Sequence, residues 1–173
     1  QVLTNYPNGV DLLRQSTAYV SLEPCSHHGK TPPCADLIIK SGIPAVVIGI
    51  SDPFARVNGM GIKKLEEAGI KVTSNVLKDA CKELNKRFFT FQDHKKPYVI
   101  LKWAQTKDGF FAPTDGSTLR ISSSESEQLV HQWRTQESAI LVGKNTAIAD
   151  NPQLTARHWD GKNPLRVLID RNL

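Results

Sequence analysis

The chain has 173 residues, 39% of them hydrophobic and 23% charged, a balance that is typical of folded globular proteins and excludes disordered and coiled-coil chains. Its 22 Lys and Arg against 17 Asp and Glu leave a net charge of +5, but no long basic run is present, so the cations suit small anionic ligands better than nucleic acid. The longest apolar run, residues 45–50, is far shorter than the roughly 20 residues of a membrane helix, and no signal segment opens the chain. We therefore expect a cytoplasmic protein without nucleic-acid or membrane partners.

The first half of the chain predicts strands that alternate with helices. Runs of β-branched, aromatic and aliphatic residues predict strands at residues 17–22, 45–50 and 70–73. Helical patterns predict helices at residues 35–40, 61–68 and about 77–92. Gly42 and Gly69 follow the first two of these helices, where glycine commonly ends a helix. This order implies right-handed crossovers and an open sheet covered by helices.

The polar segment Asp93–Pro97 (DHKKP), which is broken by proline, is the best candidate for a domain boundary. A new alternation follows it, with strands predicted at residues 98–104, 139–142 and 165–170. Ser124 and Glu127 have the spacing of a capping box, which predicts a helix that begins there and runs to about Thr135. We therefore expect two α/β units, residues 1–94 and 95–173.

Two of the three cysteines, Cys25 and Cys34, flank a loop (PCSHHGKTPPC) that leads from a strand into a helix. Three cysteines are too few for a disulfide framework, and paired thiols in a reducing compartment more often hold a metal. The helix dipole favours the ionised thiolate, which is a good ligand for zinc. The spacing is not the tight one of a zinc knuckle, so spacing alone leaves open a pair of unrelated buried cysteines.

This stretch, with the preceding Ser-Leu-Glu and the following Ala-Asp, resembles the zinc loop of the cytidine-deaminase superfamily. Its Thr-Pro-Pro insert resembles the deaminase domain of the bifunctional riboflavin-biosynthesis deaminase/reductase family. The resemblance implies that Cys25 and Cys34 are zinc ligands, and that a His-x-Glu motif supplies the third ligand and the proton-shuttling glutamate. No histidine precedes Cys25, so we expect this motif before Gln1, residues 1–4 as the continuation of its helix, and no deaminase catalytic residue within the chain. Glu23 matches the family's Leu-Glu-Pro-Cys and not the proton shuttle.

The loop at residues 52–61 (DPFARVNGMG) also resembles this family, whose loop has Asp-Pro followed by Gly-x-Gly. Gly59 and Gly61 allow a close backbone approach at the start of a helix. Asp52 and Asn58 are candidates for substrate contacts, and a role in the turn is an equally good interpretation.

The second unit resembles the reductase domain of the same family, which has a dihydrofolate-reductase-like fold. The resemblance is carried by residues 98–109 (YVILKWAQTKDG), 139–146 (AILVGKNT), 149–155 (ADNPQLT) and 164–170 (PLRVLID). It implies hydride transfer from a nicotinamide cofactor. By residue match, the contacts with NADPH would be Ala104, Arg120, Thr146 and Asp150. The contacts with the phosphorylated ribosylaminopyrimidine would be Thr118, Arg134, Leu154 and Arg157.

Several of these residues have other interpretations. Arg120 departs from the aromatic residue expected at its position, and Thr118 replaces a serine but keeps the hydroxyl. Arg134 can serve as a cation at a helix C-terminus, Arg157 as a loop charge and Asp150 as a turn residue. The family's later glycine-rich loop is not found before residue 173.

The sequence therefore predicts an α/β chain, with an incomplete three-layer cytidine-deaminase-like domain followed by an incomplete dihydrofolate-reductase-like domain. The expected function is zinc-dependent deamination of a diaminopyrimidine ribosylamino phosphate, then NADPH-dependent reduction of its ribosyl group, in a homo-oligomer. We expect this chain alone, truncated at both ends, to be impaired. The alternatives are a zinc-dependent nucleic-acid-editing deaminase or RNA-binding module, and a catalytically inactive remnant.

Overall fold

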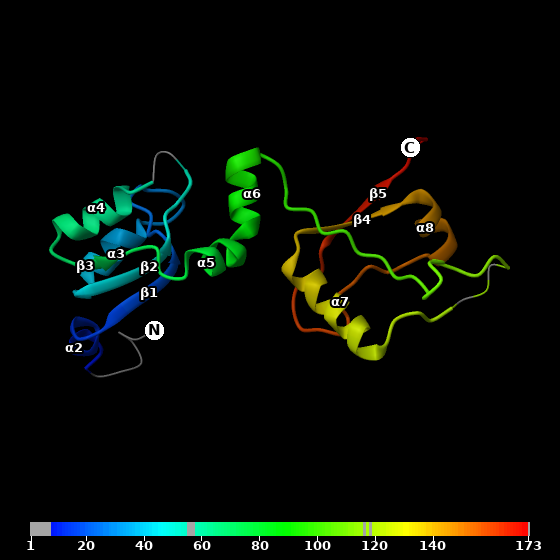
Figure 1. Ribbon diagram of the computed structural model, residues 1–173, viewed down its shortest axis with the longest axis horizontal. Helices are drawn as coiled ribbons and strands as arrows, with labels where there is room; N and C mark the ends of the chain where they lie inside the picture. Colours follow the sequence, from blue (N-terminus) through cyan, green and yellow to red (C-terminus); the bar gives the residue numbers. More distant parts are fainter. Residues whose placement is uncertain (1–7, 55–57, 116, 118, 173) are drawn as a thin grey trace. The chain divides into compact units, whose positions relative to one another are not determined.

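The computed structural model describes residues 8–54, 58–115, 117 and 119–172, and the chain divides into two compact units, Gln1–Ile100 and Leu101–Leu173 (Figure 1). The division lies inside the run YVILKWA, beyond the polar segment at Pro97. Tyr98 belongs to the first unit because its ring contacts two cations of that unit. The ring centroid lies 5.2 Å from Nζ of Lys86 and 5.5 Å from the guanidinium of Arg87. Residues 1–4, expected to continue the upstream helix, lie outside the described residues.

The first unit has a parallel sheet of three strands, β1 (Thr17–Leu22), β2 (Ala45–Ile50) and β3 (Lys71–Thr73), in that order. The register pairs Thr17 with Ala45, Leu22 with Ile50, and Ala45 with Lys71. All three predicted strands are confirmed, and the fully apolar β2 is the central strand. Its helices are α2 (Gly9–Arg14), α3 (Cys34–Lys40), α4 (Met60–Glu67), α5 (Lys78–Leu84) and α6 (Lys86–His94).

Helices cover both faces of this sheet. On one face, Val46 and Ile48 of β2 pack in a buried cluster with side chains from α3 and α4, the two helices that connect the strands (Figure 1). On the other face, Gly49 lies against α5, because a Cβ at this position would be 2.2 Å from Sγ of Cys81. Alternate residues of β2 therefore face different helices, and the unit has three layers. Cys81 is thus a packed residue of α5.

The prediction of one helix over residues 77–92 is wrong, because the chain forms two helices that are separated at Asn85. The side chain of Asn85 donates through Nδ2 to the carbonyl oxygen of Cys81 (2.8 Å) and to Oγ of Ser21 in β1 (3.3 Å). An asparagine amide that bonds to nearby backbone competes with helix continuation. Periodicity does not reveal this break, since it depends on a contact with a strand 64 residues away in sequence.

The second unit has a parallel sheet of two strands, β4 (Ala139–Gly143) and β5 (Leu165–Ile169), with helices α7 (Ser124–Gln136) and α8 (Lys144–Asp150). Their register pairs Ala139 with Leu165 and Gly143 with Ile169. An ion pair of 3.1 Å between Lys144 and Asp170 joins the start of α8 to the end of β5. None of the helices in the described part of the chain is long and apolar enough to cross a membrane.

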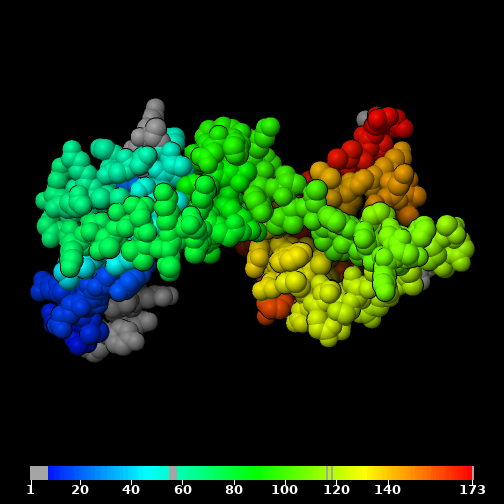
Figure 2. All heavy atoms as spheres, in the orientation of Figure 1, coloured from blue at the N-terminus to red at the C-terminus, as the bar shows by residue number. Residues whose placement is uncertain are grey.

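The strand predicted over residues 98–104 is not formed. A strand exists through pairing with a neighbour, and in the described part of the chain β4 and β5 pair only with each other. Val99, Leu101 and Trp103 are accordingly exposed by 67%, 78% and 61%. The irregular chain continues through residues 107–115, which are drawn in lime at the surface in Figure 2.

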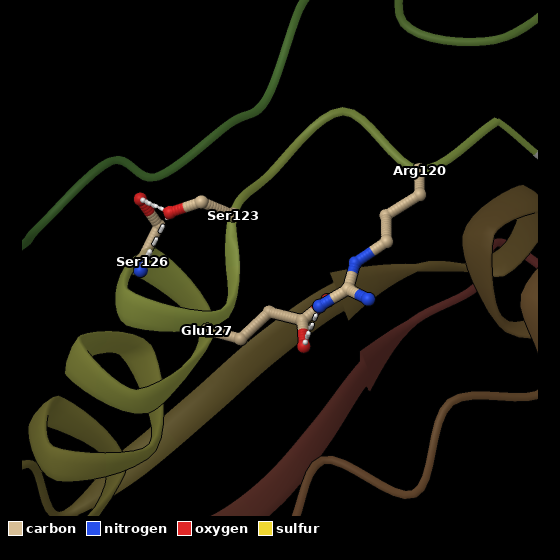
Figure 3. A network of polar contacts seen from close by, with 4 residues as sticks. All are labelled: Arg120, Ser123, Ser126 and Glu127. Atoms are coloured by element: carbon tan, nitrogen blue, oxygen red, sulfur yellow. Dashed lines mark hydrogen bonds and ion pairs between the residues drawn. The ribbon is translucent and has the colours of Figure 1, made fainter.

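The helix predicted from the capping box is confirmed as α7, but its cap is one residue earlier. Oγ of Ser123 accepts a hydrogen bond from the backbone N–H of Ser126 at 3.3 Å, which is the usual N-cap contact (Figure 3). Glu127 does not complete the box; its carboxylate pairs with Arg120 at 3.1 Å. The serines at 123 and 124 are consecutive, and spacing alone did not distinguish which of them caps the helix.

Candidate functional site

The first candidate site lies at the carboxyl ends of β1 and β2, where Glu23 organises the loop that leads into α4. Its side chain is buried. Oε2 accepts hydrogen bonds from the backbone N–H groups of Asp52 (3.2 Å) and Gly59 (3.0 Å), and Oε1 accepts from Gly61 (2.9 Å) and Ile62 (3.4 Å). One carboxylate thus satisfies the N–H that follows β2 and three donors at the start of a helix, where backbone N–H groups lack intrahelical partners. Sequence reasoning missed this role of Glu23. The signal in the sequence was a glutamate directly after a strand that is followed by a second buried strand.

Two glycines permit this arrangement, as predicted. A Cβ at Gly61 would lie 1.9 Å from the carbonyl oxygen of Pro24, so only glycine allows the helix to approach the loop after β1. Gly59 has a φ of 78°, in the left-handed region that favours glycine. The loop after β1 and the start of α4 are therefore in direct backbone contact.

Asp52 shapes the turn after β2. Its Oδ1 accepts from the N–H of Phe54 at 2.8 Å, an Asx turn, and the backbone N–H of Asn58 donates to the carbonyl of Phe54 at 3.0 Å. Burial raises the pKa of Asp52 above its ordinary value and the charge of Glu23 adds to this rise, although the bond from Phe54 acts in the opposite direction. The described hydrogen bonds of Asp52 and Asn58 thus shape this turn and, through the N–H of Asp52, connect it to Glu23.

The two loop cysteines lie together at the start of α3. The backbone N–H of Cys34 donates to Sγ of Cys25 at 3.3 Å, and that of Ala35 donates to the carbonyl oxygen of Cys25 at 3.1 Å. The pKa of Cys34 is raised, first by burial and then by its hydrogen bond and charge interaction with Cys25. At Cys34, burial and the second sulfur thus act against the thiolate that the helix start is expected to favour.

These two sulfurs fit two positions of a tetrahedral zinc site but do not make a complete one. In the ranges that the structure describes, no group of three or more His, Cys, Asp or Glu side chains is placed to hold a metal ion. His27 and His28, in the same loop, are exposed. The described residues therefore supply two sulfur donors for a metal and no third donor.

The residues expected against NADPH lie on separate segments of the second unit, and the described contacts do not join them. Ala104 is in the irregular segment before α7. Thr146 and Asp150 are exposed on α8. Arg120 turns its guanidinium toward α7, where Nη2 lies 3.1 Å from Oε2 of Glu127 (Figure 3). Both side chains of this pair are largely exposed, so the pair contributes about 0–1 kcal/mol to stability.

The residues expected against the substrate converge better, because Arg134 and Arg157 meet at Thr155. Nη1 of Arg134 donates to the carbonyl oxygen of Thr155 at 2.9 Å, and Nη1 of Arg157 lies 3.5 Å from its Oγ1. Leu154, the residue before, has a φ of 56°, which turns the chain here. Thr118, the fourth residue of this set, lies outside the described residues.

Two histidines that sequence reasoning missed complete this cluster. His131 precedes Arg134 by one helical turn on α7 and is 5% exposed. Its ring lies 4.6 Å from that of His158, at an interplanar angle of 78°. Burial lowers the pKa of His131, and Arg134, His158 and Arg157 lower it further. The signal in the sequence was the i, i+3 spacing of His131 and Arg134.

Comparisons with known proteins give a family match for the second unit. Residues 97–173 match the family RibD_C, described as the RibD C-terminal domain. The chain is 46% identical over 159 residues to the riboflavin biosynthesis protein RibD of Aquifex aeolicus, and this match covers 91% of the chain and 45% of that protein. The match to RibD of Escherichia coli strain K12 is 37% identical over 169 residues and covers 90% of the chain and 46% of that protein.

Solved structures give the same result. A diaminohydroxyphosphoribosylaminopyrimidine deaminase/5-amino-6-(5-phosphoribosylamino)uracil reductase from Thermotoga maritima has a TM-score of 0.79 and 48% identity, over 87% of this chain and 43% of that one. RibD of Acinetobacter baumannii, form 1, has a TM-score of 0.81 and 37% identity, over 92% of this chain and 47% of that one. The predicted α/β class with parallel sheets is thereby confirmed. The chain spans less than half the length of the relatives it matches.

Proposed function

We propose that the chain belongs to the RibD family and that its second unit is part of an NADPH-dependent reductase of riboflavin biosynthesis, because residues 97–173 match the RibD C-terminal domain and the chain is similar to RibD proteins over about nine-tenths of its length. The proposed substrate is a phosphorylated ribosylaminopyrimidine, whose ribosyl group is reduced to ribityl. The single observation that supports this substrate class best is the convergence of Arg134 and Arg157 on Thr155.

A phosphate group suits this convergence. A guanidinium is always charged and presents its N–H donors in a fork that matches phosphate oxygens. Arg134 is held in place by the carbonyl of Thr155, while its Nε remains without a hydrogen-bond partner among the described residues. The pKa of Arg134 is lowered, first by burial and then by Arg157, so a bound anion would relieve the repulsion between the two cations.

We assign the cofactor contacts to Ala104, Arg120, Thr146 and Asp150. NADPH, when bound, supplies the hydride; the chain's own residues bind and orient it. Thr146 and Asp150 present a hydroxyl and a carboxylate on consecutive turns of α8, both exposed. Arg120 would have to leave Glu127, an exposed partner, to reach a cofactor.

For the first unit we propose a part of the zinc-dependent deaminase domain that acts on the same class of pyrimidine before the reduction. Cys25 and Cys34 would hold the zinc, with a ligand from outside the described residues. What supports this proposal is the contact between Cys34 and the sulfur of Cys25 at the start of α3. A homo-oligomer also stays a prediction.

The experiment that tests the reductase proposal measures ligand binding by the 173-residue chain. NADPH binding is followed by its fluorescence, and ribose 5-phosphate serves as the probe for the phosphorylated sugar. We expect Arg157→Gln to weaken ribose 5-phosphate binding about tenfold or more, since a charge-assisted hydrogen bond contributes about 1.5–3 kcal/mol. Arg166→Gln is the matched control, because Arg166 contacts only the carbonyl of Gln153, at 3.5 Å, among the described contacts. Absence of NADPH binding, or an equal loss in both variants, would contradict the proposal.

A further inference from the structure

Four basic side chains meet between α7 and the segment that follows Leu154. We call these residues, His131, Arg134, Arg157 and His158, the basic cluster. His131 and Arg134 come from one face of α7, and Arg157 and His158 come from the facing segment. The two imidazoles are in edge-to-face contact, with their centroids 4.6 Å apart, and both guanidiniums reach Thr155.

The facing segment is held firmly against α7. The backbone N–H of Ala156 donates to Oδ1 of Asn163 at 2.8 Å, and Ala156 is buried. Gly161 approaches α7 so closely that a Cβ there would lie 2.7 Å from Cβ of Thr135. The basic cluster is therefore built on a packed framework and does not consist of free surface side chains.

Two buried polar atoms of the basic cluster have no hydrogen-bond partner among the described residues. In the described part of the chain, the buried side-chain nitrogens and oxygens without a hydrogen-bond partner are Nδ1 of His131 and Nε of Arg134. Buried polar atoms are nearly always paired, so an exception calls for an explanation, of which a bound ligand is one. The two atoms belong to residues one helical turn apart on α7, and both residues contact the segment that carries Arg157 and His158.

The charges indicate what that ligand is. The groups that act on His131 are Arg134 on its own helix and Arg157, His158 and the backbone of Thr155 on the facing segment. All of the titratable groups among them are bases. Burial and these bases lower the pKa of His131 and so favour its neutral form, while the backbone of Thr155 acts in the opposite direction. An anion placed between the guanidiniums reverses this balance.

We propose that the basic cluster binds a tetrahedral dianion and that His131 takes up one proton from solvent when the anion binds, which makes His131 a positioning residue that couples anion binding to pH. This inference rests on the proposed function, which already assigns Arg134 and Arg157 to a phosphate, and it adds His131 and the proton. The imidazolium would donate through Nδ1, the atom that is without a partner in the free protein.

The sign of the coupling follows directly. Protonation of His131 is opposed in the free protein and favoured in the complex, so the anion binds more tightly as the pH falls. One coupled proton changes the dissociation constant at most about tenfold per pH unit. The change is confined to the interval between the pKa of His131 in the free protein and its pKa in the complex.

The test uses sulfate and the 173-residue chain. Sulfate remains a dianion across the pH range of interest, whereas phosphate would itself titrate and confuse the result. We expect the dissociation constant for sulfate, measured at constant ionic strength with chloride as the competing salt, to fall at least threefold between pH 7.5 and pH 5.5, within the limit of about tenfold per pH unit.

His131→Asn separates a titration role from a structural one, because asparagine keeps a polar atom near the position of Nδ1 but takes up no proton. We expect this variant to bind sulfate weakly, with no dependence on pH. His94→Asn is the matched control, since His94 is exposed at the end of α6 in the first unit, and it should retain the pH dependence of the wild type. A wild type whose sulfate binding is absent or independent of pH, or a His131→Asn variant that retains the pH dependence, would overturn the proposal.

A second measurement keeps the test valid if His131→Asn does not fold. The five histidine rings can be titrated by NMR in the wild-type chain with and without sulfate. Asn variants of His27, His28, His94 and His158 each remove one signal, and the remaining signal belongs to His131. We expect sulfate to raise the pKa of His131; an unchanged value would refute the coupling. NADPH binding distinguishes this inference from the proposed function, since a chain that binds NADPH but shows no proton uptake loses only the inference made here.

Discussion

Replacing Glu23 by glutamine tests whether one buried carboxylate holds the loop between β2 and α4. Gln has a single carbonyl oxygen, so at least two of the four backbone N–H donors lose their acceptor, and the new NH₂ group points at them. Each hydrogen bond to a charged group contributes about 1.5–3 kcal/mol, so we expect a loss of about 3–6 kcal/mol in the local stability of the loop.

Native-state hydrogen exchange measures this loss at the affected amides. Because about 1.4 kcal/mol is a factor of ten, the two amides that face the new NH₂ group, either Asp52 and Gly59 or Gly61 and Ile62, should exchange at least roughly 100-fold faster in Glu23→Gln than in the wild type. Glu66→Gln is the matched control, since Glu66 is exposed on α4, the same helix. An acceleration below about fivefold in Glu23→Gln, or an equal one in the control, would refute the reasoning that the charge of Glu23 organises this loop.

Three further predictions concern the first unit. Gly61→Ala should lower the free energy of unfolding by about 3 kcal/mol, measured by urea unfolding with circular dichroism, because the new Cβ meets the carbonyl of Pro24. Gly29→Ala is the control, and it should stay within about 0.5 kcal/mol of the wild type because the space around Gly29 is open. Asp52→Asn should raise the thermal midpoint of unfolding near pH 7 and leave it unchanged near pH 3. The folded-state pKa of Asp52 is raised, so the contribution of its carboxyl group to stability is present at low pH and is lost as the pH rises. A variant that is less stable than the wild type near pH 7 would contradict this sign. Asn85→Ala should cost about 1 kcal/mol through loss of the bond to the last turn of α5, and an unchanged midpoint would show that this bond does not define the helix end.

The elements of the first unit were the most predictable part of the fold. The strand over residues 17–22 and the strand over residues 45–50 form with the predicted bounds, because a buried parallel strand needs a run of apolar residues that is visible without any partner. The break at Asn85 was not visible, since it depends on a bond to β1. The run at residues 98–104 has the composition of a strand but is irregular, because composition supplies the propensity and a neighbouring strand supplies the hydrogen bonds.

The candidate sites, too, have parts that the sequence predicts and parts that depend on the tertiary structure. A pair of thiols that leads into a helix can be found from the sequence, and so can the choice of arginines as candidates for phosphate contacts. Whether two arginines share a threonine depends on how residues 153–158 return to α7, which lies about twenty positions earlier.

By itself, the sequence determined the α/β class, the strands of the first unit and the residue types available for anion and metal chemistry. Only the tertiary structure decided which atoms are buried together. It placed Glu23 under four backbone donors, left the cysteine pair without a third ligand among the described residues, and brought two histidines to the two arginines. The physical reason is that periodicity records which residues avoid water, whereas hydrogen-bond partners and pKa values depend on distances between groups that are remote in the chain.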